Sequence, residues 1–361
     1  MRKAIIAMSG GVDSSVAALL TKQKGDDCIG ATMQLFHNED IGEKREKACC
    51  SLDDVNDARS VAYKIGMPYY VFNFTGRFKE EVIDRFVSSY QKGMTPNPCI
   101  DCNRYLKFDK LMDRMRELGR DYIVTGHYAR IEYDEETGRY LLKKAKDDSK
   151  DQSYVLYTLT QEQLAHVEFP LGIFNKEEVR EIAAQHGFIN ARKHDSQDIC
   201  FVPDGDYAAF IERYTGQADK IGSFIDKNGT FICRHKGITH YTIGQRRGLG
   251  IPADRRLYVC GIDPESGNVT LGDDKDLFHD ELIAGDVNMI VCDRLSEKTE
   301  VTAKIRYRHK EQPAVAWQDD DGKLHVKFDT PQRAITAGQA VVLYQGDTVV
   351  GGGVIESVVL R

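Results

Sequence analysis

The sequence lacks the long apolar segments of a membrane protein. No run of about 18 apolar residues is free of charge, which is the length that a spanning helix needs. The first residues, MRKAIIAMSGGVDSS, hold too few apolar residues before the glycines to form the core of a secretory signal. We therefore expect a soluble cytoplasmic protein with no membrane partner. Nine cysteines, an odd number, argue against the disulfide framework of a secreted protein.

An excess of positive charge is also missing. The 361 residues include 49 Lys and Arg against 56 Asp and Glu, a net charge of -7. Binding to nucleic acid depends on local rather than total charge, so the total does not exclude it. Basic residues gather at 150–152, 246–247, 255–256 and 304–310. The last segment has a cation at every second position: Lys304, Arg306, Arg308 and Lys310. If this segment formed an extended strand, the four cations would share one face.

Strand-like and helix-like segments alternate over the first 126 residues. Such alternation predicts an α/β fold with a doubly wound parallel sheet. The expected strands are 2–8, 28–36, 68–74 and 121–126, and the expected helices are 12–23, 53–65, 77–91 and 103–118. A hairpin is expected at 128–145, and a charged surface excursion at 37–52 could form a lid together with 195–205.

The composition changes along the rest of the chain. Helical patterns dominate from 151 to about 215. Short β-rich segments separated by DKNG, DPESGN and DDDG turns follow, which is typical of a small antiparallel barrel or sandwich. We expect an N-terminal α/β domain at 1–210, a small central α+β domain at 211–280 and a C-terminal β-barrel at 281–361.

A phosphate-binding loop is predicted where the first strand meets the first helix, at Ser9-Gly10-Gly11-Val12-Asp13-Ser14-Ser15. Amides at a helix N-terminus attract anions, and glycines allow phosphate to approach the backbone. The segment has neither the Gly-Lys-Ser/Thr of a Walker loop nor a Gly-x-Gly-x-x-Gly pattern. Its serines and aspartate could alternatively do no more than cap the helix.

The loop resembles the SGGxDS signature of the PP-loop ATP pyrophosphatases, which have an adenine nucleotide alpha hydrolase-like fold. This resemblance implies ATP cleavage between the α and β phosphates, with Asp13 helping to hold Mg²⁺. Met33 would lie beside the adenine. The residues expected at ATP are Ala7, Met8, Ser9, Gly10, Gly11, Val12, Asp13, Ser14, Met33 and Gly126.

Two cysteines are candidates for sulfur chemistry. Cys102, in TPNPCIDCN, comes just before an expected helix, whose dipole would favour its thiolate. Cys200 lies where the polar DSQDI becomes the apolar FVP, and a cysteine there would ordinarily be a buried structural residue.

Together with the phosphate loop, these segments resemble the tRNA-specific 2-thiouridylase family. Members share a Pro-Asn-Pro…Cys-Asn loop and a Ser-Gln-Asp-Ile-Cys-Phe segment, and the resemblance extends to TGHYA at 125–129, KDQSY at 150–154 and GQRRGLG at 244–250. It implies an enzyme that thiolates C2 of the wobble uridine, position 34, of glutamate, glutamine and lysine tRNAs. An upstream sulfur donor, such as a cysteine desulfurase or a relay protein, would load the enzyme.

Residue roles follow from the same resemblance. Cys200 would carry the persulfide, and Cys102 would be the nucleophile that closes a reversible disulfide with Cys200 or bonds C2 transiently. ATP would adenylate the uracil O2, because AMP leaves more readily than the carbonyl oxygen. The target base would meet Asn97, Pro98 and Cys99, and tRNA would meet His127, Lys150, Asp151, Gln152, Arg306, Tyr307 and Gln339.

Cys99 departs from the family pattern, because many relatives have an acidic residue before the catalytic cysteine. It could be a neutral replacement, or a redox partner of Cys102 in a Cys-x-x-Cys pair. Alternatively, Cys99, Cys102 and Cys200 could hold a [4Fe–4S] cluster with one open iron. The adjacent Cys49 and Cys50 could bind metal, relay sulfur or have no task.

Two other functions compete with this interpretation. A PP-loop ligase that adenylates a small metabolite would need neither the paired cysteines nor a basic β-domain. A noncatalytic RNA-binding protein with a vestigial nucleotide site would not need Cys102 and Cys200 beside an intact SGGVDSS loop.

Overall fold

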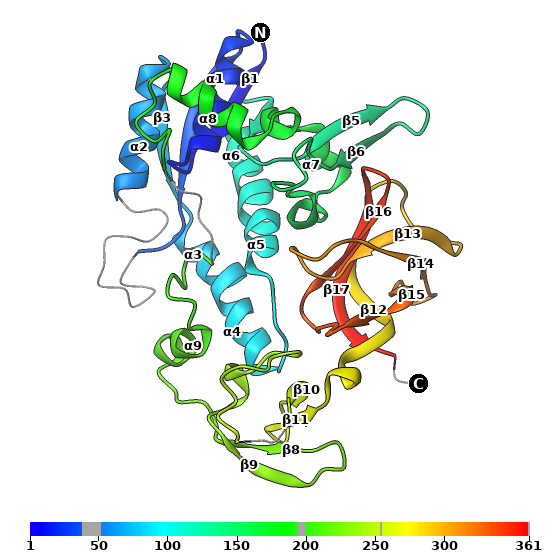
Figure 1. Ribbon diagram of the computed structural model, residues 1–361. Coiled ribbons are helices and arrows are strands. Elements are labelled where there is room, and N and C mark those ends of the chain that lie inside the picture. Colours follow the sequence, from blue (N-terminus) through cyan, green and yellow to red (C-terminus); the bar gives the residue numbers. More distant parts are fainter. Residues whose placement is uncertain (38–51, 194–198, 253–254, 360–361) are drawn as a thin grey trace. The chain divides into compact units, whose positions relative to one another are not determined.

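The structure is a computed structural model that describes residues 1–37, 52–193, 199–252 and 255–359 (Figure 1). The chain forms two compact units. Unit 1 comprises 1–82, 99–205 and 346–350, and unit 2 comprises 83–98, 206–345 and 351–361. Among the described residues, no helix is both long and apolar enough to cross a lipid bilayer.

Unit 1 is built on a parallel five-stranded sheet in the order β3-β2-β1-β4-β7. Strands β2 and β3 are added on one side of β1, and β4 and β7 are then added on its other side. The strand order therefore reverses between β1 and β4. Open α/β sheets bind ligands at the carboxyl ends of strands at such a point. The strands are β1 Lys3–Ala7, β2 Asp27–Gln34, β3 Tyr69–Asn73, β4 Tyr122–Val124 and β7 Val167–Glu168.

Helices and a hairpin surround this sheet. Ile6, Val16 and Val124 are buried in one apolar cluster that joins strands to helices. The α-helices are α1 Val12–Gln23, α2 Leu52–Lys64, α3 Thr75–Phe78, α5 Pro98–Asp101, α6 Leu111–Glu117, α7 Gln161–Ala165 and α8 Lys176–Gln185. There are also two π-helical segments, η1 Lys79–Ile83 and η2 Cys102–Lys110, and two 3₁₀ turns, η3 Ser153–Leu156 and η4 Pro170–Ile173. The hairpin consists of the strands β5 Arg130–Asp134 and β6 Arg139–Lys143.

The helix expected at 103–118 begins earlier than predicted. It starts with α5 at Pro98, continues as the π-helical η2 and ends with α6. The cysteines at 99 and 102 therefore lie within helical turns and not in a loop before a helix. π-helical turns are rare and are frequent at functional sites.

Unit 2 begins with helices and a small mixed sheet. The helices α4 Asp84–Gln91 and α9 Tyr207–Thr215 pack through the rings of Phe86 and Phe210, whose centroids are 6.2 Å apart. The sheet has the order β10-β11-β8-β9, with Phe224 and Val259 in its core. Its strands and flanking 3₁₀ turns are β8 Gly222–Ile225, β9 Phe231–His235, η5 Ile238–His240, β10 Tyr258–Asp263, β11 Asn268–Gly272 and η6 Asp274–Leu277.

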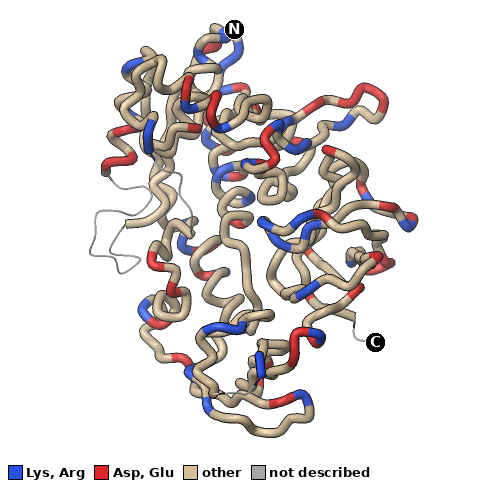
Figure 2. Tube along the Cα trace, viewed as in Figure 1, with Lys and Arg blue, Asp and Glu red and all other residues tan. Residues whose placement is uncertain are grey.

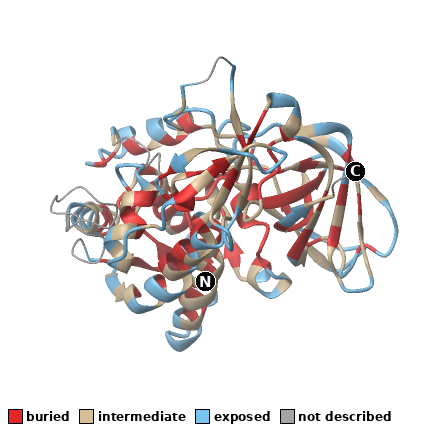
Figure 3. Ribbon diagram, turned by 90° about the horizontal axis from the view of Figure 1, so that it is seen from below, coloured by how far each residue is buried: buried red, intermediate tan, exposed pale blue. Residues whose placement is uncertain are grey.

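Six antiparallel strands form a barrel that belongs to unit 2 except for residues 348–350. They follow the order β12-β15-β14-β13-β16-β17, and pairing of β12 with β17 closes the barrel. Buried residues follow the strands, as Figure 3 shows. The strands are β12 Phe278–Met289, β13 Thr299–Lys304, β14 Gln312–Gln318, β15 Leu324–Arg333, β16 Ala340–Gln345 and β17 Thr348–Val358.

The predicted fold class is confirmed: a doubly wound parallel sheet and a C-terminal antiparallel barrel are both present. The domain boundaries at 210 and 280 stay a prediction. The two compact units interleave along the chain, because 83–98 belongs to unit 2 and 346–350 to unit 1.

The basic segment at 304–310 is not the strand that its alternation suggested. β13 ends at Lys304, and the chain then turns (Figure 2). Ile305 is buried, and the Arg306 guanidinium donates to the Ala334 carbonyl at 2.9 Å and to the Thr336 hydroxyl at 2.6 Å. The four cations therefore lie along a turn and do not share one strand face.

Candidate active site

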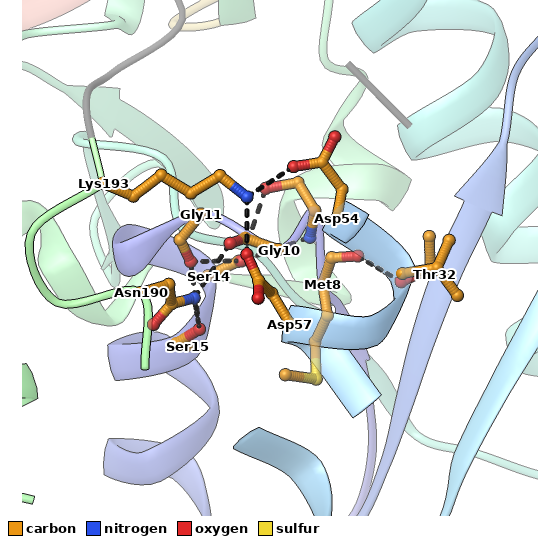
Figure 4. Close-up of polar contacts among 12 residues, drawn as sticks. Met8, Gly10, Gly11, Ser14, Ser15, Thr32, Asp54, Asp57, Asn190 and Lys193 are labelled. Atoms are coloured by element: carbon orange, nitrogen blue, oxygen red, sulfur yellow. Dashed lines mark hydrogen bonds and ion pairs between the residues drawn. The ribbon is translucent and has the colours of Figure 1, made fainter. Parts of the chain in front are cut away.

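The phosphate loop joins β1 to α1 in a shape fixed by its own hydrogen bonds (Figure 4). Gly10 has a φ of +78°, and a Cβ there would lie 2.3 Å from the Asp54 carbonyl oxygen, so only glycine fits. The Ser14 hydroxyl donates to the Gly11 carbonyl at 3.0 Å and accepts from the Ser9 amide at 3.2 Å. Because no side chain caps α1 at Gly11, the helix N-terminus suits an anion such as phosphate.

Asp13, the residue expected at Mg²⁺, faces a buried lysine. Lys176 is 5% exposed, and its ammonium lies 2.8 Å from both Asp13 carboxylate oxygens. The Tyr128 hydroxyl donates to the same carboxylate at 2.8 Å. Mg²⁺ with ATP commonly takes only one or two protein carboxylates, so Asp13 fits the expected role if it exchanges its lysine partner for the metal.

Sequence reasoning missed Lys176. The Asn175 side chain caps α8, with Glu178 completing a capping box, and this places Lys176 at the first residue of the helix. The capping box was readable in the sequence and located the helix start. Nothing local, however, indicated that this helix end lies against Asp13.

The other residues expected at ATP differ in their burial and contacts. Gly126, after β4, approaches α1 so closely that a Cβ would lie 2.7 Å from the Ser14 amide nitrogen. Met33 is half-buried on β2. Met8 is 2% exposed, its amide donates to the Ala31 carbonyl, and its own carbonyl accepts from the Thr32 hydroxyl at 2.6 Å. Met8 therefore supports the loop from within the sheet.

Cys102 is buried at 9% exposure, and this burial raises the pKa of its thiol. Desolvation outweighs the nearby cation Lys107, so the net shift of this pKa opposes the thiolate that the helix dipole was expected to favour. The next residue, Asn103, is also buried and donates to the Val155 carbonyl at 3.1 Å. Burial therefore disfavours the Cys102 thiolate, and the thiol lies in a helical turn.

Cys200 and Cys99 are more accessible than Cys102. Cys99 is exposed and Cys200 half-buried. The residue after Cys200, Phe201, is 1% exposed and packs edge-on against Phe78 with ring centroids 5.7 Å apart. No disulfide joins Cys102 to Cys200 in the structure, so the expected reversible disulfide stays a prediction. Cys49, Cys50 and most of the expected lid, at 38–51 and 194–198, lie outside the described residues.

The cysteine trio does not fit an iron–sulfur cluster as it is arranged here. Over the described ranges, no three His, Cys, Asp or Glu side chains are grouped so that they could hold a metal ion. Cys99, Cys102 and Cys200 are all within those ranges.

The two residues before those expected at the target base, Thr95 and Pro96, are anchored within unit 2. The Gln339 amide donates to the carbonyls of Thr95 and Pro96 at 2.8 and 3.3 Å, and the Thr95 amide donates to the Ala337 carbonyl at 2.9 Å. Asn97 follows directly and is half-buried. Gln339, expected at tRNA, thus holds the 95–97 segment against the barrel turn at 336–339.

Several residues expected at tRNA have structural partners. His127 is 8% exposed between the rings of Phe108 and Phe169, and burial holds its pKa well below the ordinary value. Asp151 is buried and accepts from the Ala145 amide at 3.0 Å. Gln152 accepts from the Tyr128 amide at 3.0 Å. Lys150 is half-buried and Tyr307 is 36% exposed.

Three family models cover nearly the whole chain. A tRNA methyl transferase HUP domain matches residues 2–204, a tRNA methyl transferase PRC-barrel domain matches 208–273, and an aminomethyltransferase beta-barrel domain matches 279–355. Among solved structures, a 4-thiouridine synthetase–RNA complex with bound ATP is similar at 20% identity and a TM-score of 0.38, covering 56% of this chain and 45% of that one.

Curated relatives match over the full length. The chain is 56% identical to the tRNA-specific 2-thiouridylase MnmA 1 of Thermoanaerobacter pseudethanolicus, over 98% of both chains. It is 53% identical to the tRNA-specific 2-thiouridylase MnmA of Clostridioides difficile, again over 98% of both. With this identity and coverage, and with the phosphate loop and both expected cysteines in unit 1, the chain belongs to the tRNA-specific 2-thiouridylase family.

Proposed function

We propose that the protein is an ATP-dependent tRNA sulfurtransferase that converts the wobble uridine to 2-thiouridine. The observation that carries this proposal is the full-length match to tRNA-specific 2-thiouridylases in a chain that keeps the phosphate loop, Cys102 and Cys200. Glutamate, glutamine and lysine tRNAs are the expected substrates.

Activation of the base is the first step of the proposed reaction. The uracil O2 attacks the α-phosphorus of ATP, and pyrophosphate leaves at the N-terminus of α1, which no side chain caps. Asp13 would help to hold Mg²⁺, which neutralises charge on the phosphates. The resulting adenylate turns the carbonyl oxygen into a leaving group.

Sulfur transfer follows from a persulfide on Cys200. A donor such as a cysteine desulfurase or a relay protein would load this half-buried thiol. The terminal sulfur attacks C2 and AMP leaves. Cys102 then attacks the Sγ atom of Cys200. The bond between this Sγ and the transferred sulfur breaks, and the transferred sulfur stays on C2. A Cys102–Cys200 disulfide forms, which a cellular thiol reductant must reopen.

The alternative role of Cys102, a transient bond to C2, uses the same thiol earlier in the reaction. In either role Cys102 must lose its proton, and its burial opposes this in the free protein. We infer that Cys102 becomes reactive only with tRNA bound.

The test is in vitro thiolation of unmodified glutamate tRNA with ATP, Mg²⁺ and a persulfide source under anaerobic conditions, read as 2-thiouridine by mass spectrometry. Cys102→Ala and Cys200→Ala should each abolish product. Cys99→Ala and the matched control Cys233→Ala, at a half-buried cysteine of unit 2, should retain it. Absence of 2-thiouridine with the unmodified protein, or pyrophosphate release triggered by a small metabolite alone, would contradict the proposal.

A further inference from the structure

The phosphate loop accepts two hydrogen bonds from the side chain of Asn190, a residue far along the chain. Asn190, beyond the end of α8, is 3% exposed. Its side-chain amide donates to the Gly10 carbonyl at 2.9 Å and to the Ser15 hydroxyl at 2.9 Å (Figure 4). Ser15 in turn donates to the Gly11 carbonyl at 3.0 Å. Asn190 thus contacts both the glycine turn and the first turn of α1.

These contacts set the direction of the Gly10–Gly11 peptide. The structure has no cis peptide bond among its described residues, and in a trans peptide the C=O and N–H point in opposite directions. Since the Gly10 carbonyl faces Asn190, the Gly11 amide points away from Asn190. A peptide between two glycines meets little steric resistance to flipping, so a fixed hydrogen bond is needed to keep one orientation.

The segment that carries Asn190 is itself secured. The Lys193 ammonium lies 2.6 Å from an Asp54 carboxylate oxygen and 2.7 Å from one of Asp57, both on α2 (Figure 4). The backbone of Asp54 is also the neighbour that leaves no room for a side chain at Gly10. The segment 190–193, α2 and the phosphate loop therefore form one connected cluster.

We propose that Asn190 is a positioning residue for the triphosphate: it orients the Gly10–Gly11 peptide so that the Gly11 amide donates to the pyrophosphate moiety, and Lys193 holds the segment in place. This inference rests on the proposed function only in taking the loop as the ATP site. It assigns no contact between Asn190 and the nucleotide.

The first test is binding of inorganic pyrophosphate and of ATP with Mg²⁺ to the full chain, measured by calorimetry without tRNA. Asn190→Ala should weaken pyrophosphate binding about ten-fold, the effect of losing one charge-assisted hydrogen bond. Asn190→Asp should weaken it further, because a carboxylate would repel the Gly10 carbonyl. Arg192→Ala, at the exposed neighbour, should bind pyrophosphate as the unmodified protein does.

A second variant separates positioning from folding. Lys193→Met should weaken pyrophosphate binding by a smaller factor, and Lys193→Arg should restore it. In steady state, Asn190→Ala should raise the KM for ATP more than it lowers kcat, with an unchanged circular dichroism spectrum. Unchanged pyrophosphate affinity in Asn190→Ala, or no pyrophosphate binding by the unmodified protein, would overturn the inference. If pyrophosphate binding changes as expected while no 2-thiouridine forms, the proposed function fails and the inference stands.

Discussion

Replacing Lys176 with methionine tests the ion pair beneath the phosphate loop. The Lys176 side chain is 6% exposed, and that of Asp13 is 29% exposed. Two charges at about 4 Å attract by about 4 kcal/mol at an effective dielectric constant near 20. Because Asp13 keeps some water contact and its hydrogen bond from Tyr128, we expect Lys176→Met to cost about 2 kcal/mol, less than the 3–5 kcal/mol of a fully buried pair.

Thermal unfolding measures this loss. In a domain of 150–250 residues, about 2 kcal/mol lowers the melting temperature by roughly 4–8 °C. The control is Lys146→Met, which removes an exposed ion pair with Glu178 and should cost under about 1 kcal/mol. Adding Asp13→Asn to Lys176→Met should recover much of the loss, because no uncompensated carboxylate remains.

Activity gives a second measure of the same change. If the Lys176 ammonium moves to the phosphates when Mg²⁺ takes Asp13, Lys176→Met should slow pyrophosphate release about 100-fold, as loss of one preorganised charge does elsewhere. If Lys176→Met has the same melting temperature and the same rate of pyrophosphate release as the unmodified protein, the reasoning is refuted.

Three further predictions concern burial and backbone geometry. Because the raised pKa leaves little thiolate, alkylation of Cys102 by iodoacetamide at pH 7–8 should be slower than that of a free peptide cysteine, as peptide mass mapping would show. Because the pKa of His127 is lowered in the folded protein, the unfolded chain binds a proton there more readily, and the free energy of unfolding should fall as the pH drops below about 6.5. His127→Phe should reduce this loss, as urea titrations at pH 5 and 7 would show. Gly338 has a φ of +89°, and a Cβ there would lie 3.0 Å from the Thr95 amide nitrogen, so Gly338→Ala should reduce 2-thiouridine formation while pyrophosphate binding persists.

Local patterns predicted the parts of the fold that local interactions determine. The strand, two glycines and amphipathic run at the N-terminus gave a helix at 12–23, and α1 spans Val12–Gln23. The parallel sheet and the barrel were predicted from alternation and turn spacing in the same way. The phosphate loop was recognisable because its chemistry is contained in seven consecutive residues.

Properties that depend on distant parts of the chain could not be predicted. Lys176 and Asn190 reach the phosphate loop only through the packing of α8 and the segment after it. The sequence also placed Cys102 near a helix start, but its burial, which decides its pKa, depends on tertiary packing. At 304–310 the alternation of cations suggested a strand, whereas bonds from Arg306 to carbonyls accompany a turn.

The hydrogen bonds between the barrel turn at 336–339 and the 95–97 segment limit which domains of this protein can be removed or exchanged. Gln339 and the Ala337 carbonyl bind a stretch that, in the chain, immediately precedes the cysteine-bearing helix. A catalytic half expressed without the barrel, or grafted onto a different RNA-binding module, would lose the support of Thr95 and Pro96. Recombination between relatives should therefore succeed only when the 95–97 segment and its barrel turn come from the same parent.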